Sequence, residues 1–224
     1  MSRLNVDKIT GATGTASGAP ITLSGDTLTA TLGTSSTVPA SVGSSMVLIK
    51  TITTSNGDTE ILLQNNSNGV TIDSTYTNYM LVLEGVVVTT DGKHVYMEVG
   101  NSDGYDNACR GGFNYWYDNG SSQGTSGNNT SRSYYWNSGL NALHNNESDG
   151  GLAGTFMLYN VSDAVYATHC TFQLVYYGTN GYNYGLSGST TTVNQYAVDR
   201  IKFSTNSDSF KAGAKVSLYG IKDA

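Results

Sequence analysis

The stretch YMLVLEGVVVTTDGKHVYMEVG, residues 79–100, decides the fold class. Two runs rich in Val, Leu, Met and Tyr flank Asp91 and Gly92. Residues with branched or aromatic side chains favour strands, and an Asp-Gly pair favours the positive φ angles of a type I′ turn. We therefore predict a β-hairpin whose turn lies at Asp91-Gly92.

Similar apolar runs, separated by turn residues, recur along the chain. Near the end, Ala214, Val216 and Leu218 alternate with Lys215, Ser217 and Tyr219, which is the pattern of a half-buried strand. No long stretch has apolar residues at helical spacing. We predict an all-β fold, an antiparallel β-sandwich of jelly-roll-like type preceded by an extended N-terminal arm. Further strands are expected at 46–54, 59–64, 153–161, 166–178, 198–204 and 214–222.

The arm is predicted to span residues 1–43, and the sandwich residues 44–224. The arm is rich in Gly, Thr, Ser and Ala and has too few large apolar residues for a core. Apolar residues alternate with Thr in 21–23 and 27–32, which indicates strands without an evident partner. We expect the arm to anchor or oligomerise the protein by pairing with another chain, and a plain linker is the alternative. The expected contact residues are Ile21, Leu23, Leu28, Ala30 and Leu32.

Charge and hydropathy exclude several classes of partner. The 224 residues include 11 Lys and Arg against 17 Asp and Glu, a net charge of −6. No basic patch could neutralise phosphates, so we expect no nucleic-acid partner. No apolar stretch approaches the length of a membrane helix, so we expect no membrane insertion. The start of the chain also lacks the apolar run of a signal peptide.

The chain has two cysteines, Cys109 and Cys170. Two cysteines cannot form a disulfide framework. The residues favour two half-buried thiols that pack as small apolar groups, and they leave a single bridge as the alternative.

Two aromatic segments are the best functional lead: FNYWYDNG (113–120) and SYYWNSG (133–139). Strand alternation places Phe113, Tyr115 and Tyr117 on the core side and Trp116 on the other. We expect a hairpin, or two strands joined by a long exposed loop at 118–132. Aromatic faces can stack on sugar rings, although the same residues also suit a sheet. The candidate ligand or glycan contacts are Trp116, Tyr135, Tyr117, Asn114, Asn119 and Arg132.

No pattern supports catalysis, a metal or a cofactor, and we expect none of them. GSSQG (120–124) lacks the strand and helix that a hydrolase elbow requires. Asp103 and Asp106 are expected in a turn, with calcium binding as the minor alternative. Glu84 and Glu98 fall in the two arms of the predicted hairpin, where nothing suggests raised pKa values.

Three segments together resemble a known family. SRLNVDKITGATGTASGAPITLSGDT (2–27), NYMLVLEGVVVTTDGKHVYMEV (78–99) and GAKVSLYGIK (213–222) are similar to tail-fibre-like structural proteins of marine bacteriophages, notably cyanophages. Residues 101–150 have no counterpart there. The resemblance implies a virion component, assembled in the bacterial cytoplasm and free of disulfides. It also implies a homotrimer, in which neighbouring chains would pair with the strand at 27–32.

We therefore expect a phage tail fibre or receptor-binding protein. Its arm would bind other virion proteins, and its sandwich would contact the host surface, with a surface glycan as the candidate ligand. The first alternative is a capsid decoration or cement protein whose arm laces over capsid subunits. A polysaccharide depolymerase is a distant third.

Overall fold

The structure is a computed structural model. It describes residues 21–24, 27–30, 46–105, 109–117, 123–128, 136–137, 143 and 151–222. The chain divides into two compact units, Met1–Ser44 and Ser45–Ala224, and each is considered by itself.

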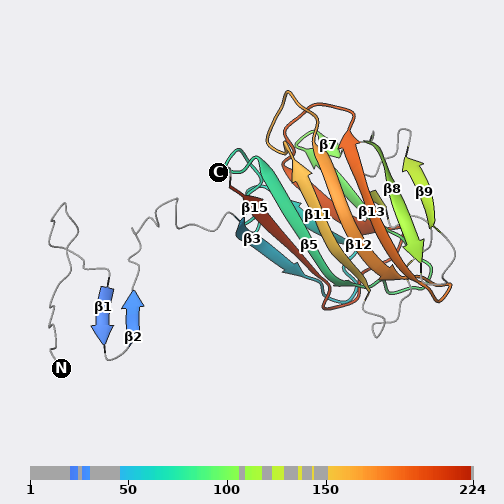
Figure 1. The fold of residues 1–224 in the computed structure, drawn as a ribbon, viewed down its shortest axis with the longest axis horizontal. Helices are drawn as coiled ribbons and strands as arrows, with labels where there is room; N and C mark the ends of the chain where they lie inside the picture. Colours follow the sequence, from blue (N-terminus) through green and yellow to red (C-terminus); the bar gives the residue numbers. More distant parts are fainter. Residues whose placement is uncertain are drawn as a thin grey trace. The chain divides into compact units, whose positions relative to one another are not determined.

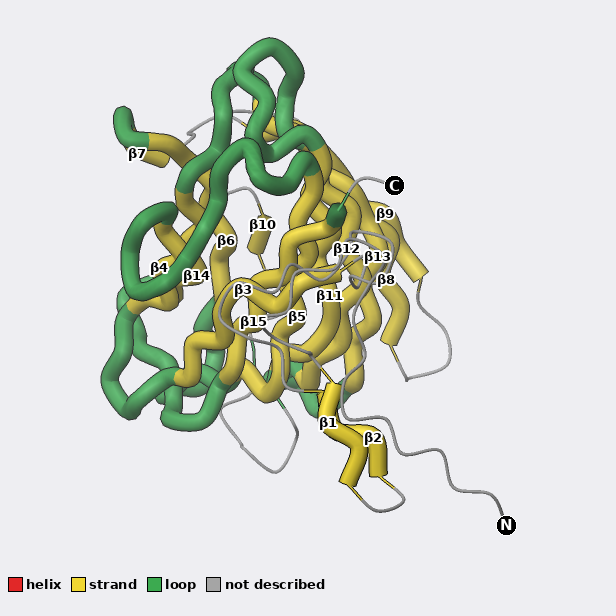
Figure 2. Tube along the Cα trace, turned by 90° about the vertical axis from the view of Figure 1, so that its left-hand side faces the viewer, coloured by secondary structure: helices red, strands yellow, loops and turns green. Residues whose placement is uncertain are grey.

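The larger unit consists of two antiparallel sheets that form two layers (Figure 2). The described residues contain no helix, so the all-β sandwich is confirmed. The larger sheet contains, in spatial order, β3 (Met46–Thr53), β15 (Lys215–Ile221), β5 (Asn78–Val86), β11 (Leu152–Tyr159), β12 (His169–Tyr177), β13 (Asn183–Thr192), β8 (Cys109–Tyr117) and β9 (Gln123–Asn128). The smaller sheet contains β10 (Trp136–Asn137), β6 (Val95–Asn101), β14 (Arg200–Thr205) and β4 (Glu60–Gln64), with β7 (Gly104–Tyr105) paired to β6.

Eight of these strands follow the order of a jelly roll. Taken along the chain, they are β3, β4, β5, β6, β10, β11, β14 and β15. The first pairs with the eighth, the second with the seventh, the third with the sixth and the fourth with the fifth. This is the pairing of one long hairpin rolled over two sheets, as in a double Greek key.

The predicted hairpin at 79–100 is wrong. Its two runs become β5 and β6, but β5 pairs with β11 and β15 in one sheet, and β6 pairs with β14 and β10 in the other. Gly92 does adopt a positive φ of 81°, but Asp91 does not adopt a positive φ, so a turn forms here that is not of type I′. The turn lies within the crossing between the two sheets, where Val88 is fully buried and bridges to Phe210.

The core between the sheets is one cluster in which aromatic rings follow one another from sheet to sheet. Phe203 on β14 meets Phe156 on β11, with ring centroids 6.0 Å apart. Phe156 meets Phe172 on β12 at 5.7 Å, and Phe172 meets Phe113 on β8 at 6.5 Å. The core therefore continues from the jelly roll into the added strands.

The added strands β12, β13, β8 and β9 continue the larger sheet beyond β11; we call them the lateral extension (Figure 1). The sequence predicts β12 and part of β8 but misses β13 and β9. Both missed strands are rich in Gly, Ser, Thr and Asn, residues that usually indicate turns. They are stable as strands because each has a paired neighbour in register.

The smaller unit contains a hairpin in which β1 (Ile21–Ser24) pairs antiparallel with β2 (Thr27–Ala30). The expectation that 27–32 lacks a partner within the arm is therefore wrong. The register pairs Ile21 with Ala30 and Leu23 with Leu28. Gly25 and Asp26 separate the strands, and two residues are the commonest hairpin connection. Leu32 lies outside the described residues.

Both cysteines are free, and both are fully rather than half buried. Cys170 on β12 lies opposite Thr190 of β13. Cys109 on β8 lies opposite Thr192, on the other side of β13. A whole strand therefore separates them by about 10 Å, beyond the reach of a disulfide. Burial raises the pKa of the Cys170 thiol, which keeps it protonated and unreactive.

Candidate functional site

The outer face of the lateral extension, which faces the viewer in Figure 1, carries a shallow open groove with a volume of about 380 Å³. Strands β11, β12, β13 and β8 all contribute to it. Its lining consists of Asn114, Thr155, Met157, Thr171, Phe172, Gln173, Ser187, Gly188 and Ser189.

Strand register arranges the outward side chains of the groove in rows. One row runs from Thr155 through Gln173 and Ser187 to Asn114, one residue from each strand. Neighbouring strands are about 4.8 Å apart, so this row presents polar groups over about 14 Å. We call these four residues the polar row. The small side chains of β13 leave the middle of the face hollow.

An aromatic side chain borders the polar row. Trp116 lies two residues from Asn114 on the same face of β8 and is 50% exposed. Its indole lies over Gly185 of β13, where a Cβ atom would collide with the ring. Val175 is paired with Gly185 from the other side and is 55% exposed. Glycine is therefore required here by the close approach of the ring.

The predicted alternation of the first aromatic segment is confirmed where it can be followed. Phe113 is buried and Tyr115 packs against the core, whereas Asn114 and Trp116 are exposed. Tyr117 belongs to β8, but its side chain is not described. Trp116 and Asn114 are thus the two candidate contacts that the structure brings together.

The other predicted contacts, Asn119, Arg132 and Tyr135, lie outside the described residues. Of the two alternatives for the aromatic segments, the hairpin is wrong, because β8 pairs with β9 and β13, whereas β10 pairs with β6 in the other sheet. The loop predicted at 118–132 also contains a strand, β9.

Sequence reasoning missed the rest of the polar row. Thr155, Gln173 and Ser187 are unremarkable in sequence, since solvent-facing strand positions commonly hold Thr, Gln or Ser. The alternation of β12 did indicate that Gln173 faces away from the core. Nothing in the sequence indicated that these residues would meet Asn114, because that depends on the order of strands in the sheet.

The glutamates considered for sugar hydrolysis are far apart. Glu84 lies on β5 opposite Lys215, and Glu98 lies on β6, so they occupy the outer faces of different sheets. Glu98 forms an ion pair of 2.8 Å with Lys202, whose Nζ also lies 4.1 Å from the centre of the Tyr105 ring. Burial, followed by the nearby carboxylate of Glu60, raises the pKa of Tyr105 to about 12. Tyr105 is therefore a neutral phenol beside the Glu98–Lys202 ion pair.

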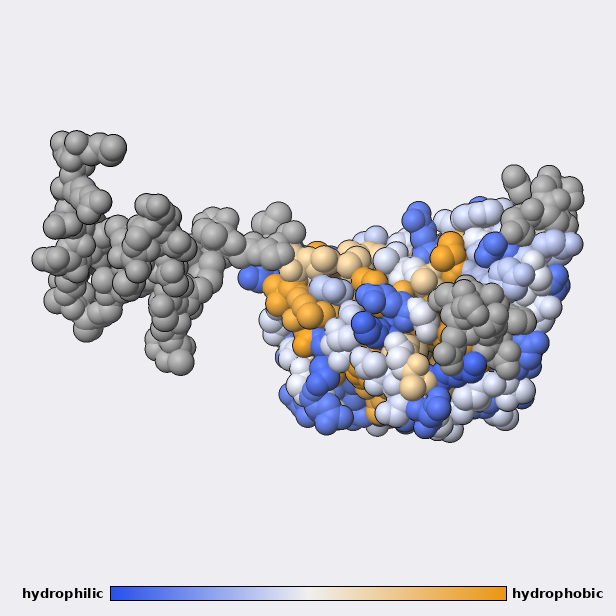
Figure 3. Space-filling model, turned by 90° about the horizontal axis from the view of Figure 1, so that it is seen from below, coloured by the Kyte–Doolittle hydropathy of each residue, from blue (hydrophilic) through white to orange (hydrophobic). Residues whose placement is uncertain are grey.

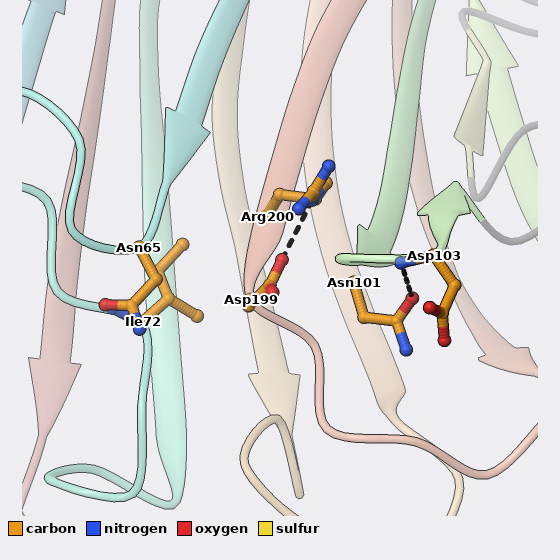
Figure 4. Close-up of polar contacts among 6 residues, drawn as sticks. All are labelled: Asn65, Ile72, Asn101, Asp103, Asp199 and Arg200. Atoms are coloured by element: carbon orange, nitrogen blue, oxygen red, sulfur yellow. Dashed lines mark hydrogen bonds and ion pairs between the residues drawn. The ribbon is translucent and has the colours of Figure 1, made fainter.

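The loop considered for calcium forms a turn at its described end (Figure 4). The side-chain oxygen of Asn101 accepts a hydrogen bond of 2.9 Å from the backbone N–H of Asp103, which is an Asx-turn. Asp106 lies outside the described residues. Among the described residues, no group of three or more His, Cys, Asp and Glu side chains could hold a metal ion.

In the part of the chain that the structure describes, no helix has the length and apolarity needed to cross a membrane. Comparison with protein-family models, curated proteins and solved structures finds no match for the chain.

Proposed function

We propose that the protein is a structural protein of a bacteriophage virion, a tail fibre or receptor-binding protein that contacts the host surface. The observation that carries the proposal is the exposed face on which Trp116 borders the polar row. Aromatic residues are enriched at binding surfaces because they offer large, rigid contact area. The resemblance of the segments at 2–27, 78–99 and 213–222 to phage fibre proteins supplies the virion context.

A shallow groove of this kind suits weak contacts that are repeated. In the expected homotrimer, three copies of the groove would act together, and avidity could exceed the affinity of one site by about a hundredfold or more. The arm would bind other virion proteins, and the outer face of the lateral extension would contact the host. The virion is the proposed location.

A capsid decoration protein is the second candidate, and the edge of the larger sheet favours it. The edge strand β3 exposes Met46 by 38% and Leu48 by 54%, and apolar surface gathers at the end of the domain where β3 lies (Figure 3). Exposed apolar edge strands are commonly covered by another chain. A capsid lattice could supply that chain, and so could a neighbouring copy in a trimer.

Labelling intact phage particles separates these candidates. Gold-tagged antibodies raised against the full chain should bind at the tail, and excess purified chain should slow adsorption of particles to host cells. Label spread over the head, with adsorption unchanged, would favour the decoration role. Particles that carry no label would contradict both.

A further inference from the structure

We propose that the groove of the lateral extension binds a neutral, hydroxyl-rich glycan, with Trp116 stacked on one sugar ring. The inference rests on the proposed attachment role and names its ligand. Three properties of this face carry it: the exposed indole beside the groove, the polar row within the groove and the absence of charge among the residues that line it.

The indole of Trp116 is held in place rather than left mobile on the surface. Gly185 lets the indole lie directly against β13, and the side chain still exposes half of its area. An aromatic ring that is held against the sheet and half exposed can pack on the apolar side of a sugar ring. Because exposed Val175 flanks the same glycine, the surface beside this end of the groove is apolar.

The polar row can make the hydrogen bonds that orient a sugar. Thr155 and Ser187 carry hydroxyl groups, and Gln173 and Asn114 carry amides, so both donors and acceptors are present. Gln173 is exposed and Ser187 is partly exposed, so a ligand in the groove can reach both side chains. Hydroxyl-rich ligands match such groups without requiring any buried charge.

The lining contains no Lys, Arg, His, Asp or Glu, which favours a neutral ligand. Recognition of a carboxylate or sulfate normally uses charge-assisted bonds, commonly from Arg. The nearest charged or titratable groups on this face are Arg110, His169 and Tyr159, in the row beyond Thr171 and Met157, and Glu84 on β5. None of these side chains lines the groove, and the first three lie at the end of the sheet opposite Trp116.

A glycan array probed with the full chain tests the inference. The array carries neutral glycans that end in glucose, galactose, mannose or N-acetylglucosamine, and acidic glycans that contain uronate or sialate. We expect binding to neutral members, and Trp116→Ala should weaken it about tenfold or more, the loss typical of a central aromatic contact. Tyr166→Ala is the matched control, because Tyr166 is 63% exposed and lies outside the groove, and it should leave binding unchanged.

A second variant keeps the tryptophan and moves it. Gly185→Ala forces the indole off β13, so it should weaken glycan binding in the same direction as Trp116→Ala. Thermal unfolding of each variant shows that the fold is kept. Gln173→Ala tests the polar row separately and should weaken binding to the neutral glycans by about threefold to tenfold, as loss of one hydrogen bond would.

The outcomes distinguish this inference from the attachment role. Binding only to acidic glycans, binding to no glycan, or equal binding by Trp116→Ala and Tyr166→Ala overturns the inference. If the chain nevertheless adsorbs to host cells in any of these cases, the attachment role stands with another ligand. Failure to adsorb to host cells contradicts the attachment role itself, even where a neutral glycan is bound.

Discussion

The jelly-roll strands and the lateral extension share one hydrophobic core, yet they are built from different residues. In β5 the buried positions hold Tyr79, Leu81 and Leu83, and the outward neighbours are also largely apolar. In β13 most positions hold Gly, Ser or Thr. Large side chains on its own strands therefore stabilise the jelly roll. Strand β13, by contrast, is stabilised by side chains of the neighbouring strands that pack against it.

Two glycines of β13 show how one strand serves both faces. On the inner face, Gly188 lies in register between Phe172 and Phe113, whose rings meet beside it. On the outer face, Gly185 lies in register between Val175 and Trp116. The first glycine makes room for core packing and the second for a surface platform. Substitutions at the two faces should therefore affect different properties.

The largest effect is expected in the jelly roll, from Phe203→Ala. The side chain is fully buried and meets Phe156 across the sandwich. Loss of a buried Phe should lower the free energy of unfolding by about 3 to 5 kcal/mol, through lost burial and the cavity left behind. Urea denaturation measures it, with Val165→Ala, at a position 68% exposed, as a control that should stay within about 0.5 kcal/mol. Equal losses in the two variants would contradict the placement of the core.

The inner face of the lateral extension should be less sensitive, and Gly188→Ala tests it. A Cβ atom there would lie 2.5 Å from the Gly112 carbonyl oxygen and 2.6 Å from Phe113 Cβ and Phe172 Cζ, so β8 and the Phe172 ring must shift. Overpacking of this kind should destabilise the fold by about 1 to 3 kcal/mol. Ser189→Ala, at the adjacent exposed position, is the control. A fully stable Gly188→Ala variant would mean that the two rings do not close over this strand.

The sequence predicts the jelly-roll strands well because their alternation is local. Ala214, Val216 and Leu218 are buried as predicted, and the expected strands near 46–54, 153–161 and 198–204 all form. Strand pairing is not local, and there the prediction fails. The Asp91-Gly92 signal is genuine, but β5 and β6 each find better partners in different sheets.

The candidate site is predictable only in part for the same reason. Alternation along β8 is enough to separate Trp116 from Phe113. The polar row, by contrast, joins residues as distant in sequence as Asn114 and Ser187 through the order β12, β13, β8. Even the short-range Gly25-Asp26 hairpin was missed, because an arm without core residues gave little reason to seek pairing within it.

A polar contact inside the jelly roll gives the next prediction, at Asp208. Its carboxylate accepts hydrogen bonds from Thr89 Oγ1 at 2.6 Å and from the Thr90 backbone N–H at 2.9 Å. These bonds link the connection between β5 and β6 to the connection between β14 and β15. Burial raises the pKa of Asp208, but the hydrogen bonds from Thr89, Thr90 and Ser209 outweigh it and hold the pKa below its usual value. Asp208→Ala should cost about 1 to 2 kcal/mol at pH 7.

The pH dependence of that cost follows from the lowered pKa. A carboxyl group whose pKa is lower in the folded state stabilises the fold above its ordinary pKa of about 4, and this stabilisation is lost as the pH falls through the folded value. The difference in unfolding free energy between the wild type and Asp208→Ala should therefore shrink between pH 5 and pH 2, an interval of about 3 units around that pKa. A difference that stays constant over this range would contradict the assigned hydrogen bonds.

The smallest effect on stability is expected on the outer face of the lateral extension, from Trp116→Ala. The indole is half exposed and lies over a glycine at the sheet surface, so its loss should cost less than about 1 kcal/mol, in the range of surface substitutions. The same variant is expected to lose most of its glycan binding. Urea denaturation and the glycan array on one preparation compare the two properties directly. If Trp116→Ala instead destabilises the fold as much as Phe203→Ala does, Trp116 is a core residue and the two faces of β13 do not divide stability from binding.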